Sequence, residues 1–324
     1  MLQPLLILFA GLALIITGAE LLVKGASGIA RKAGISEFII GLTIVAIGTS
    51  APEMVVSLVG AFEGNSDVAA GNALGSNIFN GLVILGTVAL ILPISVTKTN
   101  RNYDLPWYLG MTVCVAIASK AWTLFGIGSE DIITRWMGMV MLAVFAYYIF
   151  TTYKKSASAD AALSEDSPSP DGGKYWVYSL LSLAGLGMLI FGGQLFVDSA
   201  TEVAHIAGLS DKFIAITVLA FGTSLPEFAT SIIAALQKKS QLALGNILGS
   251  NIFNMLLIMG TSSLVSPIHM TNISLVDYGV LILGGIILCK VLFGKAETAK
   301  LGRLEGFLLI AMYAAYMVYL FNNL

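Results

Sequence analysis

The feature that most constrains this 324-residue chain is a long internal duplication. Residues 41–86 align without a gap with residues 215–260, at a constant offset of 174, and 23 of the 46 aligned positions are identical. A match of this length predicts that the chain folds as two related halves rather than as one irregular domain.

Both halves consist mainly of apolar runs of about 20 residues, the length a helix needs to cross a bilayer. Hydrophobic residues make up 57% of the chain and charged residues only 11%, against about 25% charged in soluble domains. This composition excludes a soluble enzyme and a disordered chain, and the net charge of −2 leaves no basic surface for nucleic acid. The runs predict ten membrane spans, at residues 3–25, 37–62, 68–93, 104–124, 132–153, 175–198, 211–236, 241–267, 275–294 and 303–322.

The spans divide into five in residues 1–153 and five in residues 175–324, joined by a polar stretch at 154–174. That stretch is rich in Ser, Asp and Pro and is predicted to be a flexible cytoplasmic linker. Because five is odd, the second half must enter the membrane from the opposite side. The sequence therefore predicts an all-α polytopic membrane protein with ten transmembrane helices in two inverted-topology repeats, the arrangement of many secondary transporters.

The distribution of basic residues predicts the orientation. With both termini outside, 14 of the 17 Lys and Arg residues fall in cytoplasmic loops, and only Lys120, Arg135 and Lys212 fall outside. The positive-inside rule favours this arrangement over its reverse. We therefore expect an integral protein of the cytoplasmic membrane with extracytoplasmic N- and C-termini.

Two motifs recur at mid-membrane depth in both repeats. The first reads GTSxPE and the second GNxxGSNIFN; they occupy residues 48–53 and 71–80 in the first repeat, and 222–227 and 245–254 in the second.

The first motif places Glu53 and Glu227 well inside apolar spans, where a carboxylate is costly and marks a functional site. Pro52 and Pro226 cannot donate a backbone hydrogen bond, which predicts a kink and free carbonyl oxygens in each helix. Thr49 lies four residues before Glu53, a spacing that predicts a shared helical face.

The polar side chains of both motifs are all oxygen donors, with no His or Cys among them. Carboxylates, hydroxyls, amide oxygens and free carbonyls suit hard cations, above all Ca²⁺, whereas Zn²⁺ or Cu⁺ would require imidazole or thiolate. Two carboxylates neutralise one Ca²⁺, and the remaining neutral oxygens could hold monovalent ions.

Other polar residues of the spans have structural interpretations. Glu20 is expected to form an ion pair with Lys24 one turn on. Hydrogen bonding is the favoured role for four asparagines of the second motif, Asn72, Asn77, Asn246 and Asn251. The glycines of that motif, Gly71, Gly75, Gly245 and Gly249, fit helix packing as well as they fit a functional role.

The paired motifs resemble the two alpha repeats of the sodium/calcium exchanger family, within the cation/calcium antiporter superfamily, and the resemblance covers nearly the whole chain. It implies ten helices in two inverted halves, with ions bound among helices 2, 3, 7 and 8 while helices 1 and 6 slide past them. It also implies that no cofactor is needed and that Ca²⁺ and Na⁺ are the transported substrates.

Position by position, the resemblance implies a calcium site at Glu53 and Glu227 with the backbone carbonyls of Thr49 and Thr223. It implies that sodium is bound by four serines, Ser50, Ser76, Ser224 and Ser250, and by the backbone carbonyls of Ala46 and Ala220. It places Asn80 and Asn254 along the central position.

Two departures refine this expectation. Some relatives carry Asp where this chain has Asn254, and potassium-dependent exchangers resemble that acidic pattern, so Asn80 and Asn254 argue against potassium dependence. Animal exchangers carry a large cytoplasmic regulatory domain between the halves, for which the short linker leaves no room. The chain is therefore predicted to be of the prokaryotic type.

The sequence thus predicts an electrogenic antiporter that exchanges about three Na⁺ for one Ca²⁺. A proton/calcium antiporter on the same scaffold is the alternative, although protons would need only the carboxylates and not the hydroxyls. A cation channel would be expected to use rings from identical subunits rather than one inverted duplication. The chain has no HExxH and no nucleophile–base set, so we do not expect an enzyme, and no protein partner is evident.

Overall fold

A computed structural model describes residues 2–126, 130–163, 174–206, 220–270, 273–293 and 300–323. The chain divides into two compact units, and neither unit is one of the sequence halves. Unit 1 comprises residues 1–52 and 151–246, and unit 2 comprises residues 53–150 and 247–324. Each unit therefore takes segments from both repeats.

The first half is helical, with three short π-helical turns (η) and two strands of two residues each. Its elements are α1 (Leu2–Ala33), α2 (Glu37–Ile40), η1 (Gly41–Val45), α3 (Ala46–Thr49), α4 (Ala51–Phe62), α5 (Ser66–Phe79), η2 (Asn80–Ile84), α6 (Leu85–Ile91), β1 (Ile94–Ser95), η3 (Asn100–Asp104), α7 (Leu105–Leu124), β2 (Ile132–Ile133) and α8 (Arg135–Leu163).

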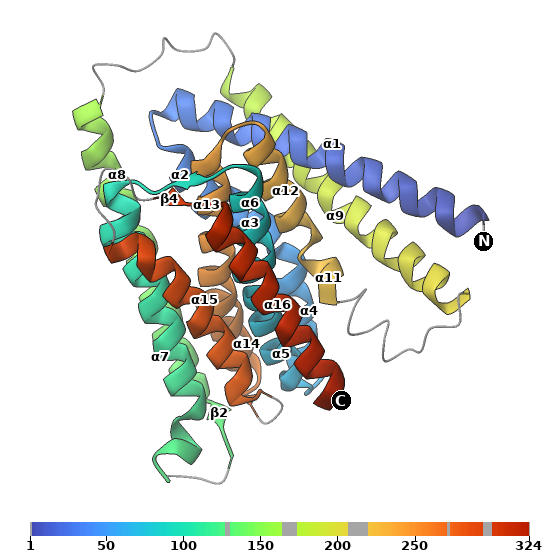
Figure 1. The fold of residues 1–324 in the computed structure, drawn as a ribbon, viewed down its shortest axis with the longest axis vertical. Coiled ribbons are helices and arrows are strands. Elements are labelled where there is room, and N and C mark those ends of the chain that lie inside the picture. The colour runs from blue at the N-terminus through green and yellow to red at the C-terminus, as the bar shows by residue number, and fades with distance from the viewer. Residues whose placement is uncertain are drawn as a thin grey trace. The chain divides into compact units, whose positions relative to one another are not determined.

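The second half repeats this order within its described residues (Figure 1). Its elements are α9 (Tyr175–Ile206), α11 (Ala220–Thr223), α12 (Leu225–Leu236), α13 (Ser240–Ile252), η5 (Phe253–Ile258), α14 (Met259–Val265), β3 (Ile268–His269), α15 (Leu275–Phe293), β4 (Lys300–Leu301) and α16 (Arg303–Asn323). The pairs α3 and α11, α4 and α12, and α6 and α14 have equal lengths and lie 174 residues apart. The duplication is therefore a duplication of secondary structure as well as of sequence.

Six helical spans among the described residues are long and apolar enough to cross a membrane. They are Gln3–Ala33, Val68–Ile91, Arg135–Lys154, Tyr175–Ile206, Ser240–Val265 and Arg303–Asn322. The pair Glu37–Thr49 and Ala51–Phe62 forms a further candidate, bent by 47° at its break. Each overlaps a predicted span, while the start of the predicted span at 211–236 falls outside the described residues. The count of ten spans stays a prediction.

In unit 1, α1 and α9 pack along their length as a pair (Figure 1). Glycines make the close approach possible: a Cβ on Gly18 would meet the Gly185 carbonyl oxygen at 2.8 Å, and a Cβ on Gly185 would meet that of Gly18 at 2.6 Å. Lipid tails are as apolar as leucine, so helices in a bilayer associate through such tight backbone contacts rather than through hydrophobic burial.

Close contacts between glycines also bring helices together in unit 2. Gly86 of α6 faces Gly306 of α16, and Gly138 of α8 faces Gly260 of α14. A Cβ on Gly86, Gly306 or Gly138 would come within 3.0 Å of the carbonyl oxygen of the facing glycine. Two short antiparallel strand pairs, β1 with β4 and β2 with β3, join segments from the two sequence halves at the ends of these helices. In the first repeat the second motif, on α5 and at the start of η2, lies in unit 2. In the second repeat α13 is divided: its residues up to Asn246 belong to unit 1, and those from Ile247 on, with η5, belong to unit 2.

Three helices are longer than the sequence predicts. The helix α1 continues to Ala33 instead of residue 25, α9 continues to Ile206 instead of 198, and α8 continues to Leu163. The first ten residues of the predicted flexible linker are therefore helical, while 164–173 lie outside the described residues. Hydropathy marks where the bilayer ends, but a helix can continue into water while its residues, such as the alanines of 157–162, favour it.

Candidate functional site

The first motif breaks its helix in both repeats at the serine two residues before the proline. Ser50 lies between α3 and α4 with φ −82° and ψ 8°, and Ser224 lies between α11 and α12 with φ −87° and ψ 6°. Pro52 and Pro226 then occupy the first turn of the following helix, where the missing N–H costs nothing. The predicted kink is confirmed, and the glutamate of each motif lies in a helical first turn.

The break corrects one expectation from spacing. Thr49 is the last residue of α3 and Glu53 is the third residue of α4, so the four-residue interval does not lie on one continuous helix. The shared-face argument was wrong because it assumed unbroken helical periodicity. Thr49 contacts the second repeat instead: its Oγ1 donates to Oδ1 of Asn246 at 3.3 Å.

Unit 1 holds one buried oxygen-rich cluster, made of residues from both repeats. Ser50 Oγ donates to Glu227 Oε1 at 2.8 Å, and both side chains are at least 98% buried. Asn246 Nδ2 donates to the Glu227 backbone oxygen at 3.4 Å and to Ser231 Oγ at 3.0 Å. Thr49 and Ser224 are also fully buried, and Thr223 is half-buried. Among the predicted ligands, the structure thus brings Thr49, Ser50 and Glu227 together.

The backbone carbonyls of Ala46 and Ala220 are among the predicted sodium ligands. Ala46 is buried at the start of α3, and its oxygen accepts from Ser50 N at 3.0 Å and from Thr49 Oγ1 at 3.4 Å. Ala220 begins α11, at the matching position of the second repeat. Each carbonyl stands one turn before the helix break.

Unit 2 holds the other predicted ligands: Glu53, Ser76, Asn80, Ser250 and Asn254, all at least 96% buried. A brace like that around Glu227 supports the start of α4. Asn72 Nδ2 donates to the Glu53 backbone oxygen and to Ser57 Oγ, both at 3.0 Å. The two braces lie at the same repeat positions, 174 residues apart.

The ligand candidates of the second motif lie where the helix widens. The π-helical turn η2 begins at Asn80, and η5 begins at Phe253, one residue before Asn254, so each turn includes one of the predicted central asparagines. Such turns are frequent at functional sites. Among the described residues no hydrogen bond reaches either amide atom of Asn80, the Ser250 hydroxyl or Asn254 Oδ1, although all are buried. Buried polar atoms in native proteins normally have partners, so these atoms call for a ligand.

The structural role expected for the four motif asparagines is confirmed. Asn72 and Asn246 hold the glutamate helices, Asn77 Nδ2 donates to the Asn251 backbone oxygen at 3.1 Å, and Asn251 Nδ2 donates to Tyr108 OH at 3.3 Å. In contrast, the expected pair of Glu20 and Lys24 is absent: both are exposed on α1, and the described part of the chain contains no ion pair between them.

Sequence reasoning missed three residues of these clusters. Ser57 and Ser231 complete the two braces, and they could have been found because they are identical at repeat-related positions. Tyr108 lies in α7, outside both motifs, and no pattern in the sequence indicated that it reaches Asn251.

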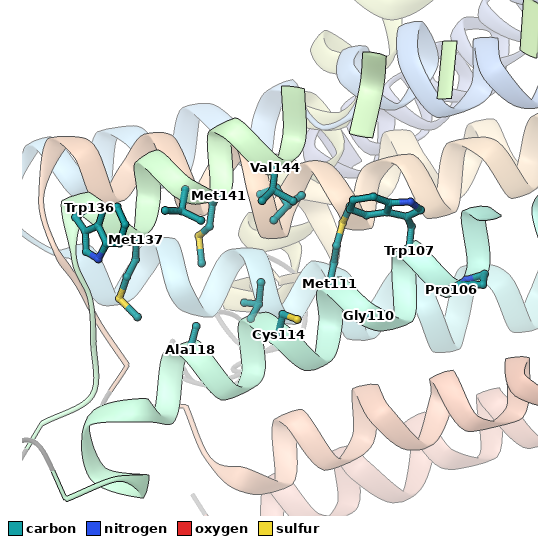
Figure 2. Close-up of a pocket in the computed structure, with 13 residues that line it drawn as sticks. Pro106, Trp107, Gly110, Met111, Cys114, Ala118, Trp136, Met137, Met141 and Val144 are labelled. Atoms are coloured by element: carbon teal, nitrogen blue, oxygen red, sulfur yellow. The ribbon is translucent and has the colours of Figure 1, made fainter. Parts of the chain in front are cut away.

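A separate apolar cavity of about 660 Å³ lies in unit 2 between α7 and α8 (Figure 2). Its lining includes Trp107, Met111, Cys114, Trp136 and Met141, and no carboxylate. It cannot balance the charge of a cation and is distinct from the oxygen clusters. The described residues also contain no group of three or more His, Cys, Asp or Glu suited to a metal ion.

Comparison with known proteins decides the family. The family model described as sodium/calcium exchanger protein matches residues 3–154 and 177–322. The chain belongs to the sodium/calcium exchanger family. The sodium/calcium exchanger MaX1 of Methanosarcina acetivorans is 31% identical over 348 residues, covering 98% of each chain. The inner membrane protein YrbG of Escherichia coli K12 is 32% identical over 323 residues, covering 99% of this chain and 98% of that one.

The fold comparison agrees. The structure of the sodium-calcium exchanger NCX_Mj soaked with Na⁺ and Ca²⁺ superposes with a TM-score of 0.83 and 30% identity, covering 98% of both chains. The resemblance drawn from the two motifs is confirmed, and the chain is a membrane-embedded cation/calcium antiporter. The exchanger family transports Na⁺ and Ca²⁺, and the described residues of the two clusters offer carboxylate, hydroxyl and amide oxygens, the atom type that these ions prefer.

Proposed function

We propose that this exchanger moves about three Na⁺ against one Ca²⁺ by alternating access, without potassium and with both termini outside the cytoplasm. The observation that carries the proposal is the contact between Ser50 and Glu227. It joins a buried carboxylate to a hydroxyl of the other repeat, beside the helix break of the first motif.

The calcium ligands in this proposal are the Glu53 and Glu227 carboxylates, together with the backbone oxygens of Thr49 and Thr223. Two carboxylates match the charge of one Ca²⁺, which favours binding in a buried site where unbalanced charge is costly. The support for pairing the glutamates comes from their repeat-related positions and matching braces.

The sodium ligands in this proposal are neutral oxygens. They are the hydroxyls of Ser50, Ser76, Ser224 and Ser250 and the carbonyls of Ala46 and Ala220. The buried Ser250 hydroxyl, which has no hydrogen bond among the described residues, supports this assignment. Both amide atoms of Asn80 and the Oδ1 of Asn254, in the same unit, likewise have no hydrogen bond among the described residues. Amides at the central position, in place of a carboxylate, support independence from potassium.

Energetics favour three sodium ions over two. Exporting Ca²⁺ against a gradient of about ten-thousandfold at about 100 mV costs about 10 kcal/mol, at about 1.4 kcal/mol per tenfold and about 2.3 kcal/mol per charge. Each Na⁺ that enters down a roughly tenfold gradient returns about 3.7 kcal/mol on the same basis. Two sodium ions return too little, whereas three suffice. One net positive charge then moves with sodium in each cycle.

The experiment is ⁴⁵Ca²⁺ uptake into proteoliposomes loaded with Na⁺, with choline replacing Na⁺ in the control. We expect uptake only with an outward sodium gradient, unchanged when potassium is omitted, and faster when the interior is made positive. Uptake driven equally well by an outward proton gradient in sodium-free buffer would replace the proposal with proton/calcium exchange. A strict potassium requirement would contradict the assignment of Asn80 and Asn254.

The voltage dependence separates the stoichiometry from the exchange itself. Potassium and valinomycin clamp the vesicles at set potentials while initial calcium flux is recorded. Sodium-driven uptake that does not change with a verified clamp, under conditions where transport limits the rate, would leave exchange intact but contradict the three-sodium cycle.

A further inference from the structure

A chain of hydrogen bonds in unit 2 connects three asparagines of the second motif. Asn77 Nδ2 donates to the Asn251 backbone oxygen at 3.1 Å, and Asn254 Nδ2 donates to Asn77 Oδ1 at 3.0 Å. All three side chains are at least 99% buried. This series of hydrogen bonds begins at the Asn251 backbone carbonyl and ends at Asn254, which the proposed function places along the cation path.

This series of hydrogen bonds determines which way the Asn254 amide faces. A backbone carbonyl can only accept, so the atom that Asn77 presents to Asn251 must be its NH₂ group. The other atom of the Asn77 amide, Oδ1, can only accept in turn, so Asn254 must present its own NH₂ group to it. The Asn254 oxygen therefore faces away from Asn77, and it is buried with no hydrogen-bond partner among the described residues.

The repeat-related asparagine, Asn80, has no such constraint. At the 174-residue offset, Asn251 corresponds to Asn77 and Asn254 corresponds to Asn80. If the repeats were equivalent, Asn251 would accept a hydrogen bond from Asn80, as Asn77 does from Asn254. The Asn251 amide instead donates to Tyr108 OH in α7 at 3.3 Å. Within the described residues neither amide atom of Asn80 is hydrogen-bonded. Two residues that the sequence makes equivalent are thus held differently.

We propose that Asn77 is a positioning residue that holds the Asn254 oxygen ready for the transported cation, so that the two central asparagines have unequal roles. The inference rests on the proposed function, because it takes Asn254 as a cation ligand. A ligand oxygen that is fixed in advance loses little rotational freedom on binding. Cation affinity should therefore depend on Asn77, although Asn77 itself need not touch the ion.

The test measures equilibrium binding of ⁴⁵Ca²⁺ to the purified full-length exchanger in detergent, with Na⁺ as competitor. Asn77→Leu keeps a similar volume but removes the hydrogen bonds, and we expect a roughly tenfold weaker calcium affinity, the loss of about one hydrogen bond. Asn77→Asp should stay within about threefold of wild type, because an aspartic acid of the same length can accept from Asn254 and, when protonated, donate to the Asn251 oxygen. If leucine prevents folding, Asn77→Ser, which is too short to reach Asn254, carries the same expectation.

The matched control is Asn251→Leu, the same change at the repeat-related position. It removes the hydrogen bond to Tyr108 but leaves the backbone oxygen that Asn77 uses, so affinity should stay within about threefold of wild type. A double variant completes the test: adding Asn77→Leu to Asn254→Ala should weaken binding no further than Asn254→Ala alone, because the oxygen to be positioned is gone. Purely structural damage would instead add a second loss.

The outcomes separate this inference from the proposed function. If Asn254→Ala weakens calcium binding while Asn77→Leu does not, or if the losses add, Asn77 is not a positioning residue and the proposed exchange stands. Equal losses from Asn77→Leu and Asn251→Leu would also overturn the inference. If wild-type protein binds no calcium, it is the proposed function that is wrong.

Discussion

The two repeats of this exchanger agree at the glutamate helices and differ at the centre of the second motif. Asn72 and Asn246 make the same pair of hydrogen bonds, each to the backbone oxygen of the motif glutamate and to a serine four residues after it. Asn77 and Asn251 occupy equivalent positions but have different partners. The duplication therefore reproduces what holds each glutamate helix in place, while the hydrogen-bond partners of Asn77 and Asn251 have diverged.

The agreement implies that the two glutamates are equally necessary. Glu53→Gln or Glu227→Gln should each lower sodium-driven ⁴⁵Ca²⁺ uptake at least about a hundredfold, because removing one charge from a buried charged set costs about 3 kcal/mol or more. The matched control is Glu63→Gln, an exposed residue just after α4 whose repeat counterpart is already Gln237. Uptake near the wild-type rate in either glutamate variant would show that the carboxylates do not act as a pair.

The two braces give a smaller effect and a sharper comparison. Asn72→Ala and Asn246→Ala each remove the hydrogen bonds to a glutamate carbonyl and a serine, so both should lower thermal stability by about 1–3 kcal/mol. Asn246 also accepts from Thr49, so its variant should be the less stable by about 1 kcal/mol. Melting temperatures in one detergent measure both. A larger loss from Asn72→Ala would contradict this ranking.

Much of this architecture could be predicted from sequence because it depends on patterns that repeat. Hydropathy located the six spans and the bent pair that the described residues contain, the duplication paired the motifs, and Pro52 and Pro226 marked the helix breaks. Oxygen donors without His or Cys indicated a hard cation. These signals are local, since each depends on residue type and spacing along one segment.

The remaining features depend on three-dimensional contacts that no spacing encodes. The interval from Thr49 to Glu53 suggested one face, but the helix ends at Ser50 and Thr49 contacts Asn246 instead. Nothing in α7 indicated that Tyr108 would reach Asn251. Two identical GSNIFN segments gave no sign that their asparagines would be held differently, because the difference comes from neighbours outside the repeat.

The smallest predicted effect concerns the turns after α4 and α12, which have the same geometry but different residues. In the first, Gly64 N donates to the Ala61 oxygen and Asn65 N to that of Gly60. The second repeats both bonds, from Lys238 to Ala235 and from Lys239 to Ala234. This pattern ends a helix with one residue in the left-handed region, a position that favours glycine. Gly64 occupies this position in the first turn, with φ 78°. Lys238 occupies it in the second, with φ 61°, although it is not a glycine.

Exchanging the two residues tests whether the turns are equivalent. Lys238→Gly should stabilise the exchanger by about 0.5–1 kcal/mol, because the left-handed strain of lysine exceeds the extra backbone entropy that glycine loses on folding. Gly64→Lys should destabilise it by a similar amount through strain alone, since no atom lies within 4 Å of where its Cβ would be. Thermal unfolding in one detergent should show opposite shifts of about 1–2 °C. Shifts of the same sign would mean that contacts of the exposed Lys238 side chain, rather than backbone conformation, determine the stability of this turn.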